Sequence, residues 1–171
     1  MATSRATSRR SPVGWFFLAA GVLYLLNILL AHVAPKLSSP WWDFFAYALL
    51  AIAFVLVFLW KVSTILRVAF IVAAVGWALL AIGTVASLGS SIATIATILA
   101  LVGTLVAGIL VIVRHTFGRL ADLVFLITAI LAALLLGHSW LTFISGAVET
   151  VIAILFGIGL VISGFLIARR R

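Results

Sequence analysis

Six apolar runs follow one another along the 171-residue chain, separated only by short polar breaks. A helix needs about 20 apolar residues to cross about 30 Å of hydrocarbon, and each run approaches or exceeds that length. The sequence therefore predicts an all-α integral membrane bundle of six transmembrane helices. The predicted spans are approximately 13–33, 42–60, 65–86, 92–113, 118–137 and 142–168.

The composition excludes several other classes of protein. The chain is 67% hydrophobic and 8% charged, with a mean hydropathy of +1.45, and cannot make the polar shell that a water-soluble domain needs. It contains no cysteine, which excludes disulfides, thiolate catalysis and cysteine-based metal sites. The net charge of +8 does not indicate nucleic acid, because the basic residues stand at the ends of apolar runs and form no patch with exposed aromatics. We expect a lipid bilayer as partner and no nucleic acid.

The basic residues are distributed very unevenly between the two sides of the predicted bundle. Only Lys36 falls on one side, and all the others fall on the other side. Because Lys and Arg are retained on the cytoplasmic side, both termini are predicted to be cytoplasmic, with the protein in a cell membrane. The residues predicted to anchor this inner face are Lys61, Arg67, Arg114, Arg119, Arg169, Arg170 and Arg171, with Arg5, Arg9 and Arg10 in the N-terminal tail.

The chain divides into a polar tail and one domain. Residues 1–11 are expected to be disordered, and 12–171 to form a single six-helix transmembrane domain. The first apolar run could also be read as a cleaved signal peptide. Its length, and the His-Val-Ala sequence before Pro35, favour an uncleaved helix. The domain is predicted to consist of three in–out–in hairpins, at approximately 12–61, 62–114 and 115–171.

A glycine pattern recurs at the ends of the last two hairpins. GTLVAG at 103–108 and GLVISG at 159–164 each precede an arginine stop, whereas the first hairpin ends FVLVFLWK without glycines. With six spans, these hairpins and endings such as GIGLVISGFLIARR resemble the HdeD family of bacterial membrane proteins. The resemblance implies a role in acid resistance or envelope stress. That family has no established catalytic motif, so the resemblance assigns no functional residues.

Small residues recur on single faces of the predicted helices. Helices in lipid associate where small side chains let their backbones approach closely. Two interpretations remain open: these residues form the seams of one bundle, or they form the contact of a homo-oligomer. The candidate packing residues are Ala69, Gly76, Gly83, Gly103, Gly108, Gly159, Ser163 and Gly164.

Four titratable residues, His32, Asp43, His138 and Glu149, fall near the outer ends of four different helices. Twenty residues of helix separate Glu149 from Arg169, which places this carboxylate at the outer boundary of the membrane. Because imidazole titrates between about pH 5 and 8, the set could sense acidity, or it could hold a metal ion. The sequence leaves open whether the four residues meet or are scattered around the rim.

No P-loop, Gly-x-Ser-x-Gly or HExxH motif is present, and we expect neither catalysis nor a cofactor. The favoured hypothesis is a non-enzymatic multi-pass membrane protein, related to envelope or acid stress, that acts through lipid or membrane-protein partners. The alternative is a small transporter or channel, monomeric or oligomeric, that uses the outer-face set. The lack of charge in the middle of the spans argues against ion coupling. A haem subunit is disfavoured because His32 and His138 lie near the rim.

Overall fold

The computed structural model describes residues 12–60, 62–138 and 146–169, and within these ranges six helices are long and apolar enough to cross a membrane. The short 3₁₀ helix η1 (Pro35–Leu37) follows the first of them. The prediction of an all-α, six-helix membrane protein is confirmed. The helices are α1 (Pro12–Val33), α2 (Pro40–Phe58), α3 (Thr64–Val85), α4 (Ser90–Arg114), α5 (Arg119–Gly137) and α6 (Gly146–Ala168).

The boundaries of α2 differ from the predicted span 42–60 for local reasons. The helix begins two residues earlier, because the Ser39 side chain accepts a hydrogen bond from the backbone N–H of Trp41, and Pro40 fits the first helical position. It ends two residues earlier, at Phe58, and Leu59 forms the C-cap. The apolar run continues past the end of the helix, so hydrophobicity alone overestimates where the helix stops.

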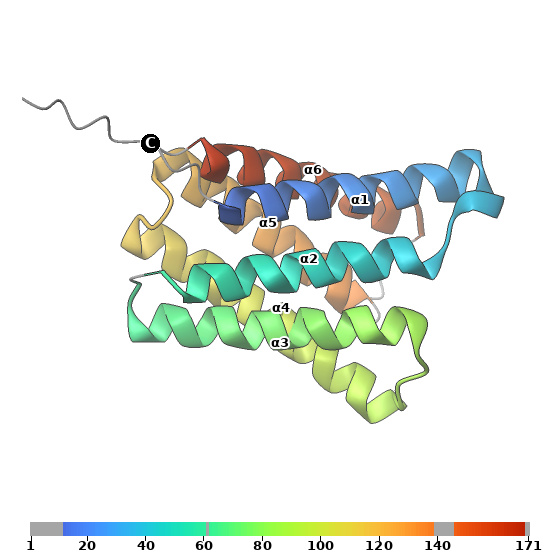
Figure 1. Cartoon of the computed structure of the whole chain (residues 1–171), viewed down its shortest axis with the longest axis horizontal. Coiled ribbons are helices and arrows are strands. Elements are labelled where there is room, and N and C mark those ends of the chain that lie inside the picture. The colour runs from blue at the N-terminus through green and yellow to red at the C-terminus, as the bar shows by residue number, and fades with distance from the viewer. Residues whose placement is uncertain (1–11, 61, 139–145, 170–171) are drawn as a thin grey trace, which may run out of the picture.

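The helices are antiparallel to their neighbours in sequence. Figure 1 shows that α1 starts and α6 ends at the same end of the bundle. We call this the basic end, since it also carries the described residues Arg67, Arg114, Arg119 and Arg169. The opposite end carries His32, Asp43, His138 and Glu149. Which end faces the cytoplasm stays a prediction from the charge distribution.

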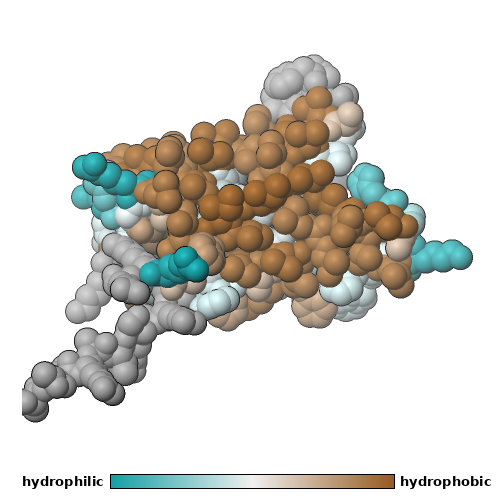
Figure 2. Space-filling view, turned by 90° about the horizontal axis from the view of Figure 1, so that it is seen from above, coloured by the Kyte–Doolittle hydropathy of each residue, from teal (hydrophilic) through white to brown (hydrophobic). Residues whose placement is uncertain are grey.

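The outer surface of the bundle is apolar between its two ends. Figure 2 shows hydrophobic residues over most of the visible face and hydrophilic residues at the two ends. Branched aliphatic side chains make up much of this surface; on α4 they include Ile98, Val106 and Ile109. A band of this kind suits contact with lipid tails, and the chain is a multi-pass membrane protein.

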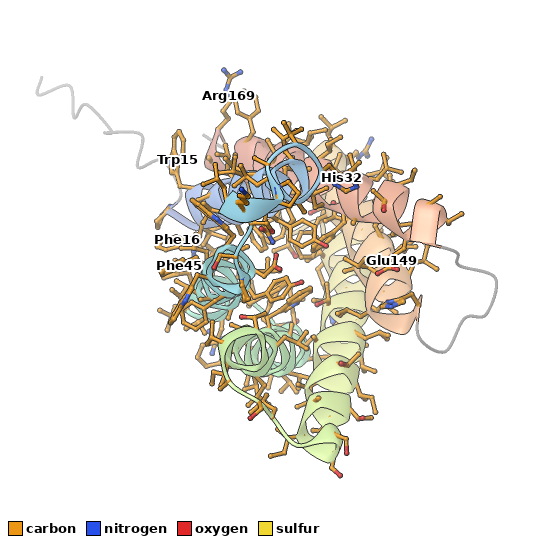
Figure 3. All side chains as sticks on the ribbon, turned by 90° about the vertical axis from the view of Figure 1, so that its right-hand side faces the viewer. Trp15, Phe16, His32, Phe45, Glu149 and Arg169 are labelled. Atoms are coloured by element: carbon orange, nitrogen blue, oxygen red, sulfur yellow. The ribbon has the colours of Figure 1, made fainter. Side chains whose placement is uncertain are left out.

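The helices form a closed ring. Each helix packs against its neighbours in sequence, and α6 returns to pack against α1. The end-on view in Figure 3 shows the helices arranged around an interior that side chains fill. Because each helix has two neighbours, the interior belongs to the whole ring rather than to any one hairpin.

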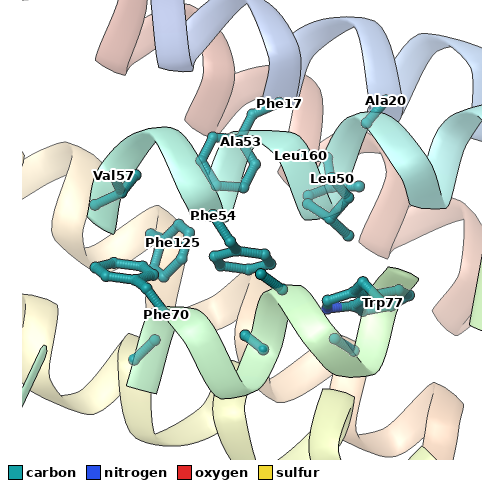
Figure 4. Close-up of a cluster of buried hydrophobic side chains, with 14 of the residues drawn as sticks. Phe17, Ala20, Leu50, Ala53, Phe54, Val57, Phe70, Trp77, Phe125 and Leu160 are labelled. Atoms are coloured by element: carbon teal, nitrogen blue, oxygen red, sulfur yellow. The ribbon is translucent and has the colours of Figure 1, made fainter. Parts of the chain in front are cut away.

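Aromatic side chains occupy the interior toward the basic end (Figure 4). Phe17 of α1 lies edge-on to Phe54 of α2 at 5.4 Å and to Phe125 of α5 at 5.7 Å between ring centroids. Phe70 of α3 lies 5.7 Å from Phe54. The four rings come from four different helices, so at this level the middle of the ring is packed with protein.

Glycines bring the backbones together at opposite sides of the ring. A Cβ atom on Gly76 of α3 would fall on the backbone of Ala100, and one on Gly103 of α4 would fall on the backbone of Ala73. At the α1–α6 contact, a Cβ atom on Gly14 would likewise fall on the backbone of α6, and one on Gly164 would fall on the backbone of α1. Only glycine permits such an approach, and in lipid these close backbone contacts replace hydrophobic burial as the source of helix association.

The other candidate packing residues lie in several different environments. Gly108 faces Ala129 of α5, and Gly159 faces Thr128, whose hydroxyl is 3.4 Å from that of Ser163. Ala69 is buried. Gly83 is exposed and lies in no seam of this bundle, because the side chain nearest to it is Leu88, which follows the same helix. Sequence reasoning missed three glycines of the α1–α6 contact, Gly14, Gly21 and Gly157.

Candidate functional site

Two adjoining cavities, of about 320 and 390 Å³, lie at the end of the ring opposite the basic end. We call them together the vestibule. Asn27, His32 and Asp43 line the smaller cavity but not the larger one. Thr94, Thr97 and His138 line the larger cavity but not the smaller one. Each of the four residues of the predicted outer-face set therefore lines one or both of these adjoining cavities. The residues that line both cavities are Tyr24, Tyr47, Leu135 and Glu149.

His138 and Glu149 form the closest contact within this set. The His138 Nε2 atom lies 3.6 Å from Glu149 Oε1, and both side chains are about two-fifths exposed. The other ring nitrogen, Nδ1, lies 2.6 Å from the backbone oxygen of Leu135. A carbonyl oxygen can only accept, so Nδ1 carries the donated proton. In the neutral imidazole the lone pair of Nε2 then points toward the Glu149 carboxylate.

Asp43 is held by residues from two segments. The Asn27 Oδ1 atom of α1 accepts a hydrogen bond from Ser38 Oγ at 3.1 Å. Asn27 also interacts electrostatically with the Asp43 side chain. Asp43 was among the residues predicted for the site and Asn27 was not, yet both line the wall of the vestibule.

Two tyrosines form the floor of the vestibule. Tyr24 of α1 is 7% exposed, and its ring centroid lies 6.1 Å from that of Tyr47 of α2. Neither tyrosine is among the residues predicted for the site. The available signal was that the chain has only two tyrosines, one in each of the first two predicted spans, and a buried phenol needs a polar partner.

A packed aromatic layer adjoins the tyrosines. Trp77 is fully buried and stacks on Phe156, with 5.9 Å between centroids and 7° between planes. Its indole N–H donates to Thr104 Oγ1 at 2.9 Å, and its ring lies 5.2 Å from that of Tyr47. The polar vestibule therefore ends on a packed aromatic layer part-way through the ring.

His32 lies at the edge of the vestibule. Its Nδ1 atom lies 2.8 Å from the backbone oxygen of Ile28 in its own helix, and the side chain is exposed. Figure 3 shows His32 on α1 and Glu149 on α6 at this end of the bundle. Within residues 12–60, 62–138 and 146–169, no three His, Cys, Asp or Glu side chains are grouped closely enough to hold a metal ion.

At the basic end, the predicted anchoring residues lie on helix ends and connections. Arg67 donates to the backbone oxygen of Trp60 at 3.2 Å, and the Arg169 guanidinium lies 3.9 Å from the centre of the Phe165 ring. Arg114 ends α4 and Arg119 begins α5. Lys61, Arg170 and Arg171 lie outside the described residues, as do the tail 1–11 and its arginines.

Asp122 is a buried acid at the basic end. It is 1% exposed, accepts a hydrogen bond from the backbone N–H of Phe117 at 2.7 Å, and lies 3.9 Å from the exposed imidazole of His115. The carboxylate thus fastens the turn between α4 and α5, where His115 adopts a left-handed φ of 47°.

Replacing Asp122 with alanine should lower the free energy of unfolding by about 1–3 kcal/mol, because the buried N–H of Phe117 loses its acceptor. Asp122→Asn keeps a side-chain oxygen and should cost less. Reversible unfolding in mixed detergent micelles, followed by circular dichroism, measures both. Equal losses for the two variants would contradict a role as hydrogen-bond acceptor.

Comparison with known proteins gives no relative. No protein-family model matches the chain, and neither the curated proteins nor the solved structures contain a match. The resemblance to the HdeD family therefore stays a prediction from the glycine and arginine pattern.

Proposed function

We propose that this protein is a non-enzymatic multi-pass membrane protein that responds to acidity through the vestibule. The observation that carries the proposal is the His138–Glu149 contact. With Nδ1 donating to Leu135, the neutral pair places a lone pair opposite a carboxylate oxygen at 3.6 Å. One added proton, on Nε2 or on the carboxylate, turns this contact into a hydrogen bond.

The added proton would join two helices. His138 follows the last residue of α5, and Glu149 lies in the first turn of α6. Histidines commonly change charge between about pH 5 and 8, so acidification across this range would draw the two helix ends together. The other titratable residues lining the vestibule are Tyr24 and His32 on α1, and Asp43 and Tyr47 on α2. α4 contributes Thr94 and Thr97 to the lining.

The charge distribution supports a prediction of which side of the membrane the vestibule faces. If the basic end is cytoplasmic, as the excess of arginine there predicts, the vestibule opens to the outside of the cell. A role in envelope or acid stress, which the resemblance to the HdeD family implies, is compatible with a sensor of external pH. Lipid or membrane-protein partners would then bind differently to the ends of α5 and α6 when these ends draw together.

Spin labels on α5 and α6 test the response, and the cysteine-free chain allows clean labelling. Ile130→Cys and Val151→Cys place labels at exposed positions. The distance distribution should narrow when the pH is lowered from about 8 to about 5. Glu149→Gln should give the narrow distribution at both pH values, because its amide N–H can donate to neutral Nε2 and its amide oxygen can accept from protonated Nε2. His138→Leu should give the broad distribution at both.

A second label pair, Val68→Cys and Val113→Cys, lies at exposed positions near the basic end and serves as the control. Its distance distribution should not change with pH. The proposal fails if the α5–α6 pair shows no pH dependence, or if Glu149→Gln still responds to pH as the unsubstituted protein does.

The transporter alternative is favoured by the depth of the vestibule, which reaches Tyr24 and Tyr47. Transport requires a continuation to the other side, and there the ring interior is filled by Trp77, Phe156 and the phenylalanine cluster. This alternative therefore needs a rearrangement of the aromatic layers. Flux into reconstituted vesicles that Trp77→Phe alters would support it.

A further inference from the structure

The vestibule walls are both acidic and apolar. The Asp43 and Glu149 carboxylates line the smaller cavity together, with Ile28, Leu135 and Ala153 beside them. Its volume, about 320 Å³, falls at the lower end of the range for small-molecule sites, and pockets of that class combine apolar walls with a few placed polar groups. The walls therefore suit an organic molecule better than a hydrated ion.

The charges of the lining residues select the sign of the ligand. Among the described residues that line the two cavities, none is a lysine or an arginine. Lys36 is exposed on η1 and does not line either cavity. When the imidazoles of His32 and His138 are neutral, the two carboxylates give the vestibule a charge of about −2, which attracts cations.

The polar groups also limit the type of cation. The carboxylates accept hydrogen bonds only, and the phenol of the deeply buried Tyr24 can accept one as well. A protonated primary amine offers three N–H donors to such groups. Asn27, which accepts a hydrogen bond from Ser38, lies in the same cavity wall as Asp43 and adds a further polar group there.

We propose that the vestibule binds a small organic cation, a protonated primary amine with an aryl or short alkyl body, through Asp43 and Glu149. The body of the ligand lies against Ile28 and Leu135, and the tyrosine rings at the floor add cation–π attraction. The inference rests on the proposed function, because it names the ligand of the same vestibule. Protonation of the His138–Glu149 pair removes negative charge, so acid weakens the binding.

Phenethylammonium is the probe, and 2-phenylethanol is its neutral counterpart of nearly the same size. Equilibrium dialysis uses the full chain in nanodiscs of zwitterionic phospholipid at about pH 8, the upper end of the range in which imidazole ordinarily titrates. Phenethylammonium should bind saturably, with one molecule per chain, and 2-phenylethanol at least about 10-fold more weakly. Equal binding of the two would overturn the inference, since it would mean that only apolar partitioning occurs.

Substitutions locate the site. Glu149→Gln and Asp43→Asn should each weaken phenethylammonium binding at least about 10-fold, because a charged hydrogen bond is lost. Glu149 is 40% exposed, so its replacement by glutamine should leave the fold intact, which circular dichroism checks. His115→Gln, at the opposite end of the bundle, should bind as the unsubstituted protein does. If both carboxylate variants bind normally, the inference is wrong.

The proposed function and this inference can fail separately. The dialysis is carried out at one fixed pH, and the spin-label experiment contains no amine. Saturable amine binding without a pH-dependent change at α5–α6 would overturn the acid response alone. A pH-dependent change without saturable amine binding would overturn the ligand assignment alone.

Discussion

Replacing Trp77 with alanine is expected to lower the free energy of unfolding by about 3–5 kcal/mol, the typical cost of deleting a large buried aromatic side chain. Trp77 has no exposed surface and contacts Tyr47 and Phe156, and its indole N–H donates to Thr104. The truncation leaves a cavity between the vestibule and the aromatic core. The helices that contact Trp77, which are α2, α4 and α6, cannot readily close it. Reversible unfolding in mixed detergent micelles, followed by circular dichroism, measures the loss.

Two further variants separate packing from hydrogen bonding. Thr104→Val removes the acceptor and nearly keeps the volume, and should cost only about 1 kcal/mol, as interhelical hydrogen bonds in membrane proteins do. Trp15→Ala, at a position 49% exposed, should change stability by less than about 0.5 kcal/mol. If Thr104→Val cost as much as Trp77→Ala, the hydrogen bond rather than ring packing would hold this layer together.

Replacing Gly103 with leucine should lower the free energy of unfolding by about 3 kcal/mol, at the upper end for overpacked sites. Any Cβ at this position would fall on the backbone of Ala73, and a backbone cannot move aside as a flexible side chain does. The helices α3 and α4 must separate, and the dispersion contacts along their whole crossing weaken. The same unfolding assay measures this loss.

The matched control is Gly89→Ala, at the N-cap of α4, where a Cβ atom meets nothing within 4 Å. This variant should fold with a stability close to that of the unsubstituted protein. Gly76→Ala, at the reciprocal position on α3, should be destabilising even though it adds a single methyl group. A tolerated Gly76→Ala would show that the α3–α4 crossing can relax, against the expectation.

Much of the fold follows from local properties of the sequence. Hydrophobic length identified all six helices, because the cost of placing a polar residue in hydrocarbon acts on each segment separately. The errors were small and local, as at α2, where Ser39 and Pro40 fixed the start and the apolar run outlasted the helix. The arginine asymmetry still predicts the orientation of the termini.

The candidate site was predictable only in part. Counting residues along the spans placed His32, Asp43, His138 and Glu149 at one level, and all four line the vestibule. The same counting gave no reason to select Tyr24 or Tyr47, since their partners lie on other helices. Among the small residues, Gly103 and Gly83 looked alike in the sequence, yet the first touches a neighbouring backbone and the second is exposed.

The sequence by itself determined the number of helices, their order and their confinement to a membrane, because each depends on the hydrophobicity of one segment at a time. The tertiary structure alone decided that the helices close into a ring, that Gly14 meets Gly164, and that His138 faces Glu149. Those contacts depend on how each helix is rotated and which helices are its neighbours. Both are set jointly by close packing across the whole ring, which no single segment encodes.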